Sequence, residues 1–166
     1  MPNYVLKNAT LGTLYPATIE QADLRIADGK IIEKSQHLDV RAGETVLDLA
    51  GKIILPGMVC AHTHLYSALA RGMPGPQEPP VNFTEILEKI WWRLDRALDA
   101  ESIYYSTVVG VLDAIATGTT TIIDHHASPG YIRGSLKIMQ AVFEQLGVRG
   151  VLCYEVTDRG GLKERD

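Results

Sequence analysis

The segment Leu55-Pro-Gly-Met-Val-Cys-Ala-His-Thr-His64 decides how this chain folds. Its apolar residues 58 to 61 stop at a polar His-Thr-His, which is typical of a buried strand that reaches the functional end of a sheet. His62 and His64 lie two positions apart, so both side chains point to the same side of an extended strand. Imidazole is a good ligand for zinc, iron, nickel and similar ions. The segment therefore predicts two metal ligands, His62 and His64, although histidines two apart also occur by chance on surfaces.

Residues before this segment read as short strands joined by turns. Alternating apolar and polar residues flank Asp28-Gly29, a dipeptide that tolerates positive φ, and this pattern predicts a β-hairpin. A similar pattern around Ala50-Gly51 predicts a second hairpin, which ends at Pro56-Gly57. We expect residues 1–55 to form a small β-sheet unit.

After residue 56 the pattern changes to strands separated by helices. Asn82, with Glu85 three residues on, resembles a capping box and predicts a helix start, whereas the proline-rich segment 73–80 must be a loop. Further helices are predicted between Asp99 and Gly118 and over residues 136–146, with strands at 119–124 and 148–154. Strands separated by helices pair in parallel, which predicts an α/β sheet or barrel. A barrel needs eight such units and about 250 residues, so we expect the chain to be truncated.

Composition excludes several classes of function. The net charge is −4 and no dense Lys/Arg cluster occurs, which argues against a nucleic-acid partner. No apolar run approaches the roughly 18 residues of a membrane span, and the first residues lack a signal-peptide pattern, so we expect a cytoplasmic protein without a membrane partner. Cys60 and Cys153 each lie in an apolar run, which favours buried free thiols over a disulfide.

Two of these segments resemble a known superfamily. Residues 55–64 resemble the PGxVxxHxH signature of the amidohydrolase superfamily of metal-dependent hydrolases, and Gly118-Thr-Thr-Thr-Ile-Ile-Asp124 resembles its second-strand motif. The β-unit before them is similar to the amino-terminal region of the same superfamily, so the resemblance covers essentially the whole chain. Within the superfamily, residues 124–129 and 153–159 look most like the SsnA-type aminohydrolases, neighbours of the chlorohydrolases and guanine deaminases.

The resemblance implies a composite fold. Residues 1–55 would be the amino-terminal part of a β-sandwich, and residues 56–166 would supply the first three strands, about a third, of a (β/α)8 TIM-type barrel. It also implies a divalent metal ion on His62 and His64, with zinc as the default and iron, nickel or manganese as alternatives. Further histidines, an aspartate and a proton-transferring glutamate would come from later strands, and no residue here matches those positions. We therefore expect no catalytic residue within this amino-terminal fragment, and no activity from it alone.

The implied reaction is hydrolysis of a non-peptide C–N bond in a small-molecule substrate, as in an aminohydrolase or deaminase. An unpaired strand edge would favour self-association, so we expect a homo-oligomer. The alternative, from a different class, is a non-catalytic remnant, either truncated or degenerate. A third reading, a zinc deaminase acting on polynucleotides, requires His-x-Glu and Pro-Cys-x-x-Cys patterns, and neither occurs.

Each of the other residues near the predicted strand ends has two possible roles. His125 is the candidate substrate-binding residue, either by touching substrate or by orienting a metal ligand, and a hydrogen-bonded loop residue is its alternative. For His126 the loop reading is favoured. Asp124 would support a metal-bound histidine through a hydrogen bond or cap the next loop. Tyr66 would approach the mouth of the pocket or lie outside it.

Several further residues are left out of the predicted site. For Glu155, Asp158 and Arg159, at the end of the third strand, a solvated loop is favoured over a pocket role. Trp91 falls on the apolar stripe of its helix, so it and Trp92 are expected to pack rather than bind. Cys60 would share a strand face with His62, but the stronger expectation is that it is an inert thiol in the core.

Overall fold

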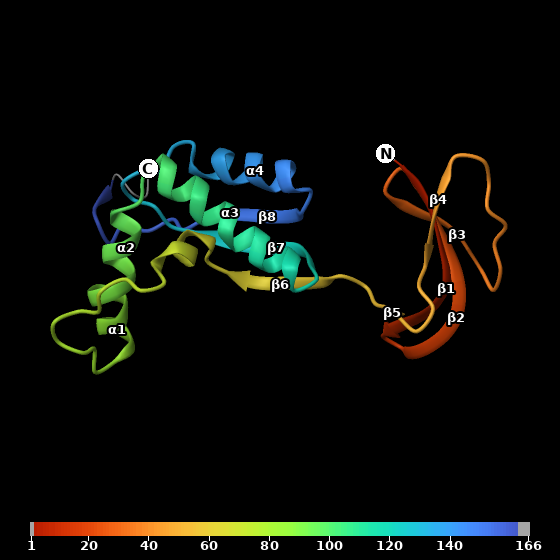
Figure 1. The fold of residues 1–166 in the computed structure, drawn as a ribbon. Helices are drawn as coiled ribbons and strands as arrows, with labels where there is room; N and C mark the ends of the chain where they lie inside the picture. The colour runs from red at the N-terminus through yellow and green to blue at the C-terminus, as the bar shows by residue number, and fades with distance from the viewer. Residues whose placement is uncertain (1, 163–166) are drawn as a thin grey trace. The chain divides into compact units, whose positions relative to one another are not determined.

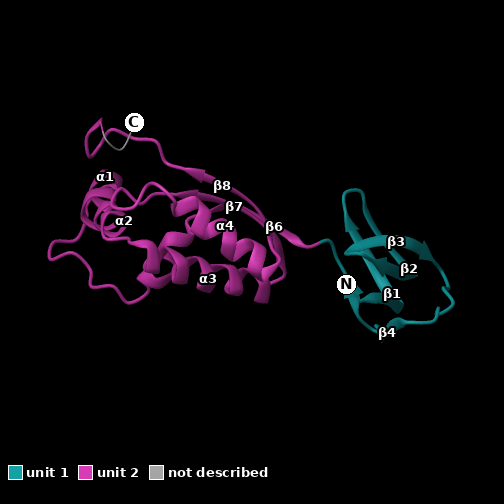
Figure 2. Ribbon diagram, turned by 90° about the horizontal axis from the view of Figure 1, so that it is seen from above, with its two compact units in different colours: residues 1–56 teal, residues 57–166 magenta. Residues whose placement is uncertain are grey.

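The computed structural model describes residues 2–162 and shows an α/β fold (Figure 1). The chain divides into two compact units, residues 1–56 and residues 57–166, coloured separately in Figure 2. Among residues 2–162, no helix combines the length and the hydropathy needed to cross a bilayer.

The first unit is a five-stranded sheet. Its strands are β1 (Asn3–Leu14), β2 (Ala17–Ala27), β3 (Lys30–Ser35), β4 (Glu44–Asp48) and β5 (Ile53–Ile54). The order is β3-β2-β1-β4, and β5 also pairs with β1. The first three strands pair antiparallel, whereas β4 and β5 run parallel to β1. A small apolar cluster on β1 and β2 forms the core: Ala9, Leu11, Ala22 and Leu24.

One of the two predicted hairpins forms. Asp28 and Gly29 have φ angles of 50° and 72°, as a tight turn between β2 and β3 requires, and this confirms the first hairpin. The second prediction is wrong, because β4 and β5 both pair with β1 and not with each other. The backbone N–H of Leu49 donates to the carbonyl of Lys7, and that of Thr10 donates to the carbonyl of Lys52. Because of these bonds, β4, the turn after it and β5 all lie along the same edge of β1.

The second unit is a parallel sheet with helices on one face. Its strands, in the spatial order β6-β7-β8, are β6 (Met58–Thr63), β7 (Thr119–His126) and β8 (Arg149–Tyr154). Helices α3 (Ala100–Ala116) and α4 (Ser135–Leu146) cover one face of this sheet (Figure 1). Between β6 and α3 lie the 3-10 helix η1 (Leu65–Ala70), α1 (Phe83–Ile86), the π-helix η2 (Leu87–Trp91) and α2 (Trp92–Arg96).

The predicted helix ends are confirmed by local hydrogen bonds. Asp99 caps α3, because its Oδ1 accepts from the backbone N–H of Ser102 while the Ser102 hydroxyl accepts from the Asp99 N–H. Gly118 follows the end of α3 with a φ of 86°, a conformation that favours glycine. Asn82 caps α1 by accepting from the N–H of Glu85, but the Glu85 carboxylate accepts from Val81 instead of completing the capping box.

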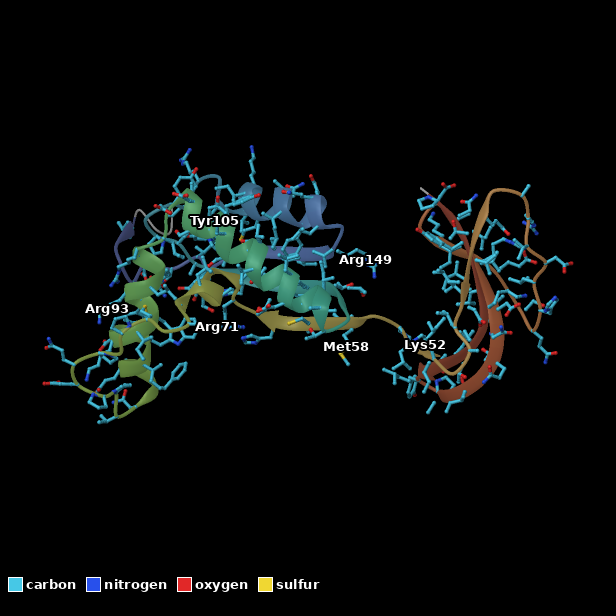
Figure 3. The ribbon with its side chains drawn as sticks, in the orientation of Figure 1. Lys52, Met58, Arg71, Arg93, Tyr105 and Arg149 are labelled. Atoms are coloured by element: carbon cyan, nitrogen blue, oxygen red, sulfur yellow. The ribbon has the colours of Figure 1, made fainter. Side chains whose placement is uncertain are left out.

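The core of the second unit lies between the sheet and its helices. Buried apolar side chains from η1, α3, β7 and α4 fill it, among them Leu65, Ile103, Val111, Ile122, Met139 and Phe143. The opposite face of the sheet is open, and Val59, Ile123 and Val151 are exposed on the three strands. Met58 projects from β6 away from α3 and α4 and is 65% exposed (Figure 3).

The two motif segments pack against each other where β6 and β7 begin. The backbone N–H of Met58 donates to the carbonyl of Gly118 at 3.0 Å. A Cβ atom on Gly57 would lie 2.2 Å from Cγ2 of Thr120, so only glycine fits beside this threonine. The glycine of the first motif is therefore matched to a threonine of the second.

Candidate metal centre

A β-bulge in β6 sets the direction of the two histidines. Cys60 pairs with Ile122 of β7, whereas Thr63 pairs with Asp124, so β6 holds one extra residue between these positions. Cys60 packs with Ile122 against the core under the helices. His62 and His64 line a pocket with Ile123 and Cys153 of the open face, so the prediction that Cys60 shares a face with His62 is wrong, whereas the stronger expectation of a core thiol agrees with its packing. The bulge re-aims the chain just before the histidines.

The ring nitrogens of the two histidines converge. Nε2 of His62 lies 3.2 Å from Nε2 of His64, and the ring planes are 88° apart. In a tetrahedral zinc site with Zn–N bonds of about 2.0–2.1 Å, two ligating nitrogens lie about 3.3 Å apart. The spacing of His62 and His64 therefore fits a shared divalent ion.

A backbone carbonyl determines which nitrogen of His64 is free. Nδ1 of His64 lies 2.9 Å from the carbonyl oxygen of His125. A carbonyl only accepts, so Nδ1 carries the proton and the lone pair of the neutral ring sits on Nε2, toward His62. Histidine ligands of metals commonly donate their other N–H to a carbonyl in this way. The chemistry of this donor set thus also fits a metal ion.

Asp124 supports the site from the helix side of the sheet. Its buried Oδ1 accepts from the backbone N–H of Leu65 at 2.7 Å, while the buried Oδ2 has no hydrogen-bond partner among residues 2–162. Burial raises the pKa of the carboxyl to about 6, although the Leu65 N–H and His64 oppose the rise. The sequence suggested a bond to a histidine ring or a cap on the next loop. The carboxylate instead caps the segment that follows His64.

The two histidines at the end of β7 occupy different environments. His125 is half-buried on the open face, and its ring centroid lies 5.5 Å from that of His64. His126 is fully buried, and its Nε2 lies 2.9 Å from the hydroxyl of Ser128, which donates to the carbonyl of Tyr131. Burial, with a smaller effect of His125, lowers the pKa of His126 to about 4. The structure thus places His125, and not His126, beside the candidate ligands.

A cleft of about 380 Å³ opens beside the histidines. Tyr66 lines it, as the sequence suggested, and its ring lies between those of His64, Trp91 and His126. Burial, with the charges of Asp95 and Glu155, raises the pKa of the Tyr66 hydroxyl to about 12. The remaining lining residues come from α1, η2, α2, β7 and the segment after β8: Phe83, Leu87, Trp91, Trp92, Asp95, His125, Glu155 and Arg159.

Trp91 packs against the core, as expected, but it and Trp92 also line the cleft, from which the sequence had left them out. The ring centroid of Trp91 lies 6.0 Å from that of His64. Helical spacing assumes 3.6 residues per turn, but residues 87–91 form a π-helix, which shifts the face on which later side chains emerge. The periodicity of the sequence therefore predicted the packing of Trp91 but not that both side chains line the cleft.

Glu155, Asp158 and Arg159 lie in a loop, and Asp158 is exposed as expected, but the side chains of Glu155 and Arg159 are partly buried and line the cleft, so the expectation is wrong for these two. One guanidinium nitrogen of Arg159 donates to Glu155 at 2.6 Å, another donates to Asp95 on α2, and the guanidinium lies 5.2 Å from the Trp92 ring centroid. Burial raises the pKa of Asp95 above its ordinary value, although Arg159 opposes the rise. Asp95 was not a candidate, because a contact between residues 64 positions apart leaves no local signal.

The described residues supply only part of a metal site. Within residues 2–162, no group of three histidine, cysteine or acidic side chains is placed to hold a metal ion. Both cysteines are free thiols; Cys60 is only partly buried and Cys153 is exposed, so the expectation of a buried thiol is wrong for Cys153. His62 and His64 are thus the candidate ligands that this chain contributes.

Comparison with known proteins gives the context of these residues. The profile of the Amidohydrolase family matches residues 53–166. The chain is 29% identical over 147 residues to a 5-methylthioadenosine/S-adenosylhomocysteine deaminase of Thermococcus sibiricus, covering 89% of this chain and 32% of that protein. It is 31% identical over 146 residues to a 5'-deoxyadenosine deaminase of Methanobrevibacter smithii, covering 88% and 31%. The chain thus spans about a third of the length of these relatives.

Solved structures share the fold at lower identity. Atrazine chlorohydrolase TrzN from Arthrobacter aurescens TC1, complexed with zinc, matches with a TM-score of 0.75 and 22% identity, covering 93% of this chain and 36% of that one. Guanine deaminase from E. coli matches with a TM-score of 0.72 and 19% identity, covering 96% and 37%. With the family profile matching more than half of its residues, this chain belongs to the amidohydrolase family.

Proposed function

We propose that this chain is part of a metal-dependent hydrolase that cleaves a non-peptide C–N bond in a small molecule, as an aminohydrolase or deaminase does. The observation that carries the proposal is the pair of Nε2 atoms of His62 and His64, 3.2 Å apart, with Nδ1 of His64 held by a carbonyl. The names of the two deaminase relatives support this class of reaction.

The proposed architecture is the one that the resemblance to the amidohydrolase superfamily implies. Residues 1–55 would be the amino-terminal part of a β-sandwich domain, and residues 56–166 the first three strands of a (β/α)8 barrel. The parallel order β6-β7-β8 supports this, since a barrel of this kind consists of parallel strands joined by helices. The two candidate ligands lie at the carboxyl end of β6 and His125 lies at that of β7, and barrel enzymes place their active sites at the carboxyl ends of their strands.

His62 and His64 would hold a divalent ion, and zinc is the default because the solved chlorohydrolase is complexed with zinc. When bound, such an ion supplies Lewis-acid chemistry that lowers the pKa of a coordinated water to about 7. His125 would contact the substrate from the floor of the cleft, and Tyr66 and Trp91 would pack against it and exclude water.

Two imidazoles provide only half of a tetrahedral site, so the proposal requires ligands and a proton-transferring carboxylate from outside the described residues. We accordingly propose that the 166-residue chain is inactive by itself. Turnover by the purified, zinc-loaded chain above that of a His62→Ala/His64→Ala variant would contradict this part of the proposal.

Zinc binding tests the site directly. Titration of the chain with zinc in competition with a chromogenic chelator should show one weak site, whose affinity falls at least about tenfold in His62→Ala and in His64→Ala. His37→Ala is the matched control, because the His37 side chain is 77% exposed and belongs to the first unit. Equal affinity in all of these variants would refute the metal site.

The same variants test the activity in a protein of the relatives' length that contains this chain. Ammonia release from amino-substituted heterocycles should be lost in His62→Ala and retained in His37→Ala. A protein that binds zinc at both histidines and hydrolyses none of these compounds would favour the alternative, a non-catalytic remnant.

A further inference from the structure

Arg159 joins two segments that both line the cleft. It follows β8, and its guanidinium donates to Glu155 of the same segment and to Asp95 of α2. The Asp95 side chain is 1% exposed and that of Arg159 is 14% exposed, so this contact is largely withdrawn from water. The guanidinium also lies against the Trp92 ring.

The helical segment 83–96, made of α1, η2 and α2, has an unusual anchor. Asp95 is the only buried residue in these three elements. Trp91 and Leu94 pack against the core of the second unit but are only partly buried. A segment that forms a cleft wall is therefore fixed at a carboxylate more than by an apolar face.

Removing the guanidinium would leave the carboxylates of Asp95 and Glu155 without an ion-pair partner among residues 2–162. Breaking a buried ion pair by deleting one partner is costly, because the remaining charge stays desolvated. The segment can relieve that cost by moving away and exposing Asp95 to water, since Asp95 is its only fully buried residue. Such a movement would carry Trp91 away from His64, because η2 continues directly into α2.

We infer that Arg159 is a positioning residue, which holds segment 83–96 as the wall of the cleft and keeps Trp91 beside His64. It acts through Asp95 and Glu155. An effect of Arg159 on substrate binding rests on the proposed function, whereas its role in holding segment 83–96 in place does not.

The two tryptophans of the chain make this role measurable. Trp91 and Trp92 both lie in segment 83–96, and the chain contains no other tryptophan. In Arg159→Ala, acrylamide quenching of tryptophan fluorescence should rise at least about twofold, because local opening exposes the indoles. Arg159→Lys keeps the charge but loses the fork that bonds both carboxylates, so its quenching should be intermediate. Arg41→Ala is the control, because Arg41 pairs with Glu33 at an exposed site of the first unit and should change nothing.

A charge swap guards against a variant that fails to fold. Asp95→Arg/Arg159→Asp should show quenching closer to wild type than Asp95→Arg alone, since the swap restores an opposite-charge pair. Circular dichroism identifies folded variants. If Arg159→Ala folds and its quenching equals that of wild type, the inference is overturned. If Arg159→Ala unfolds, wild-type quenching in folded Arg159→Lys and Asp95→Arg overturns it. If all three unfold, no recovery in the swap would overturn it.

Zinc affinity, measured in parallel, reports separately on the proposed function. The His62→Ala change should abolish zinc binding. The rise in quenching that Arg159→Ala causes should nevertheless be the same in the His62→Ala chain as in the wild-type chain. In the longer, active protein, Arg159→Ala should raise KM by a larger factor than it lowers kcat, as expected when a binding wall is displaced.

Discussion

Nδ1 of His64 lies 2.9 Å from the backbone carbonyl oxygen of His125. Through this bond β7 determines the tautomer of the residue that directly follows β6. The partner is main chain, so the side chain of His125 is left to face the cleft. The sequence had suggested that His125 either contacts the substrate or orients a metal ligand. In the structure its backbone carbonyl orients His64, and its side chain is left for the substrate.

His125→Ala should therefore leave zinc affinity within about threefold of wild type, because the carbonyl that holds His64 remains. In a longer, active protein the same change should raise KM at least about tenfold, through lost contact with substrate. Zinc titration and steady-state kinetics measure the two effects. Zinc affinity as low as that of His64→Ala would show that the His125 ring is itself a ligand.

Asp124→Ala should destabilise the second unit by about 1–3 kcal/mol, because the buried N–H of Leu65 loses its acceptor. Asp124→Asn keeps an acceptor and avoids the burial of a charge. Since the folded pKa of Asp124 is raised to about 6, its proton stabilises the fold at low pH, and that stabilisation is lost as pH rises from about 4 to about 6. The free energy of unfolding of Asp124→Asn relative to that of wild type, measured with urea, should therefore be higher at pH 8 than at pH 5.

His126 should act in the opposite direction. Its folded pKa is lowered to about 4, so the contribution to stability of the neutral ring is present above the unfolded value of 6.5 and is lost as pH falls toward 4. His126→Gln can still donate to Ser128 but cannot be protonated in this range. The free energy of unfolding of the variant should therefore depend less on pH between 6.5 and 4 than that of wild type. Parallel curves would show that His126 does not titrate on unfolding.

Asp23 should make the first unit sensitive to acid. Burial alone would raise its pKa, but Lys7 at 2.5 Å and the N–H groups of Asn8 and Leu38 lower it to about 2. A depressed folded pKa means that the stabilisation is present above the unfolded value of 3.8 and is lost as pH falls toward 2. Asp23→Asn should remove this component of acid unfolding, with Asp39→Asn as an exposed control.

Gly57→Ala should destabilise the second unit by about 1–3 kcal/mol, because the added Cβ would overlap Thr120. Gly75→Ala is the matched control, since a Cβ there meets no atom within 4 Å. Thermal unfolding measures both. Equal melting temperatures for the two variants would show that β6 and β7 can shift apart without cost.

Part of this fold could be predicted from local patterns. The strands and helices of residues 99–154 follow from apolar periodicity, from the Asp99 cap and from Gly118, because each signal acts within a few residues. The convergence of His62 and His64 was likewise predictable from their spacing. Local patterns failed where pairing decides the outcome, as for β4 and β5, which extend one edge of β1 in place of forming a hairpin.

The sequence by itself determined the order of elements, the two candidate ligands and the membership of a family, since these depend on residues close together along the chain. Tertiary structure decided which face each side chain occupies and which distant partner it meets. The bulge after Cys60, the π-turn before Trp92 and the contact of Arg159 with Asp95 are of this kind. Their common cause is physical: a one-residue shift of register or a contact across 64 positions changes the face or the burial of a side chain without altering the local pattern around it.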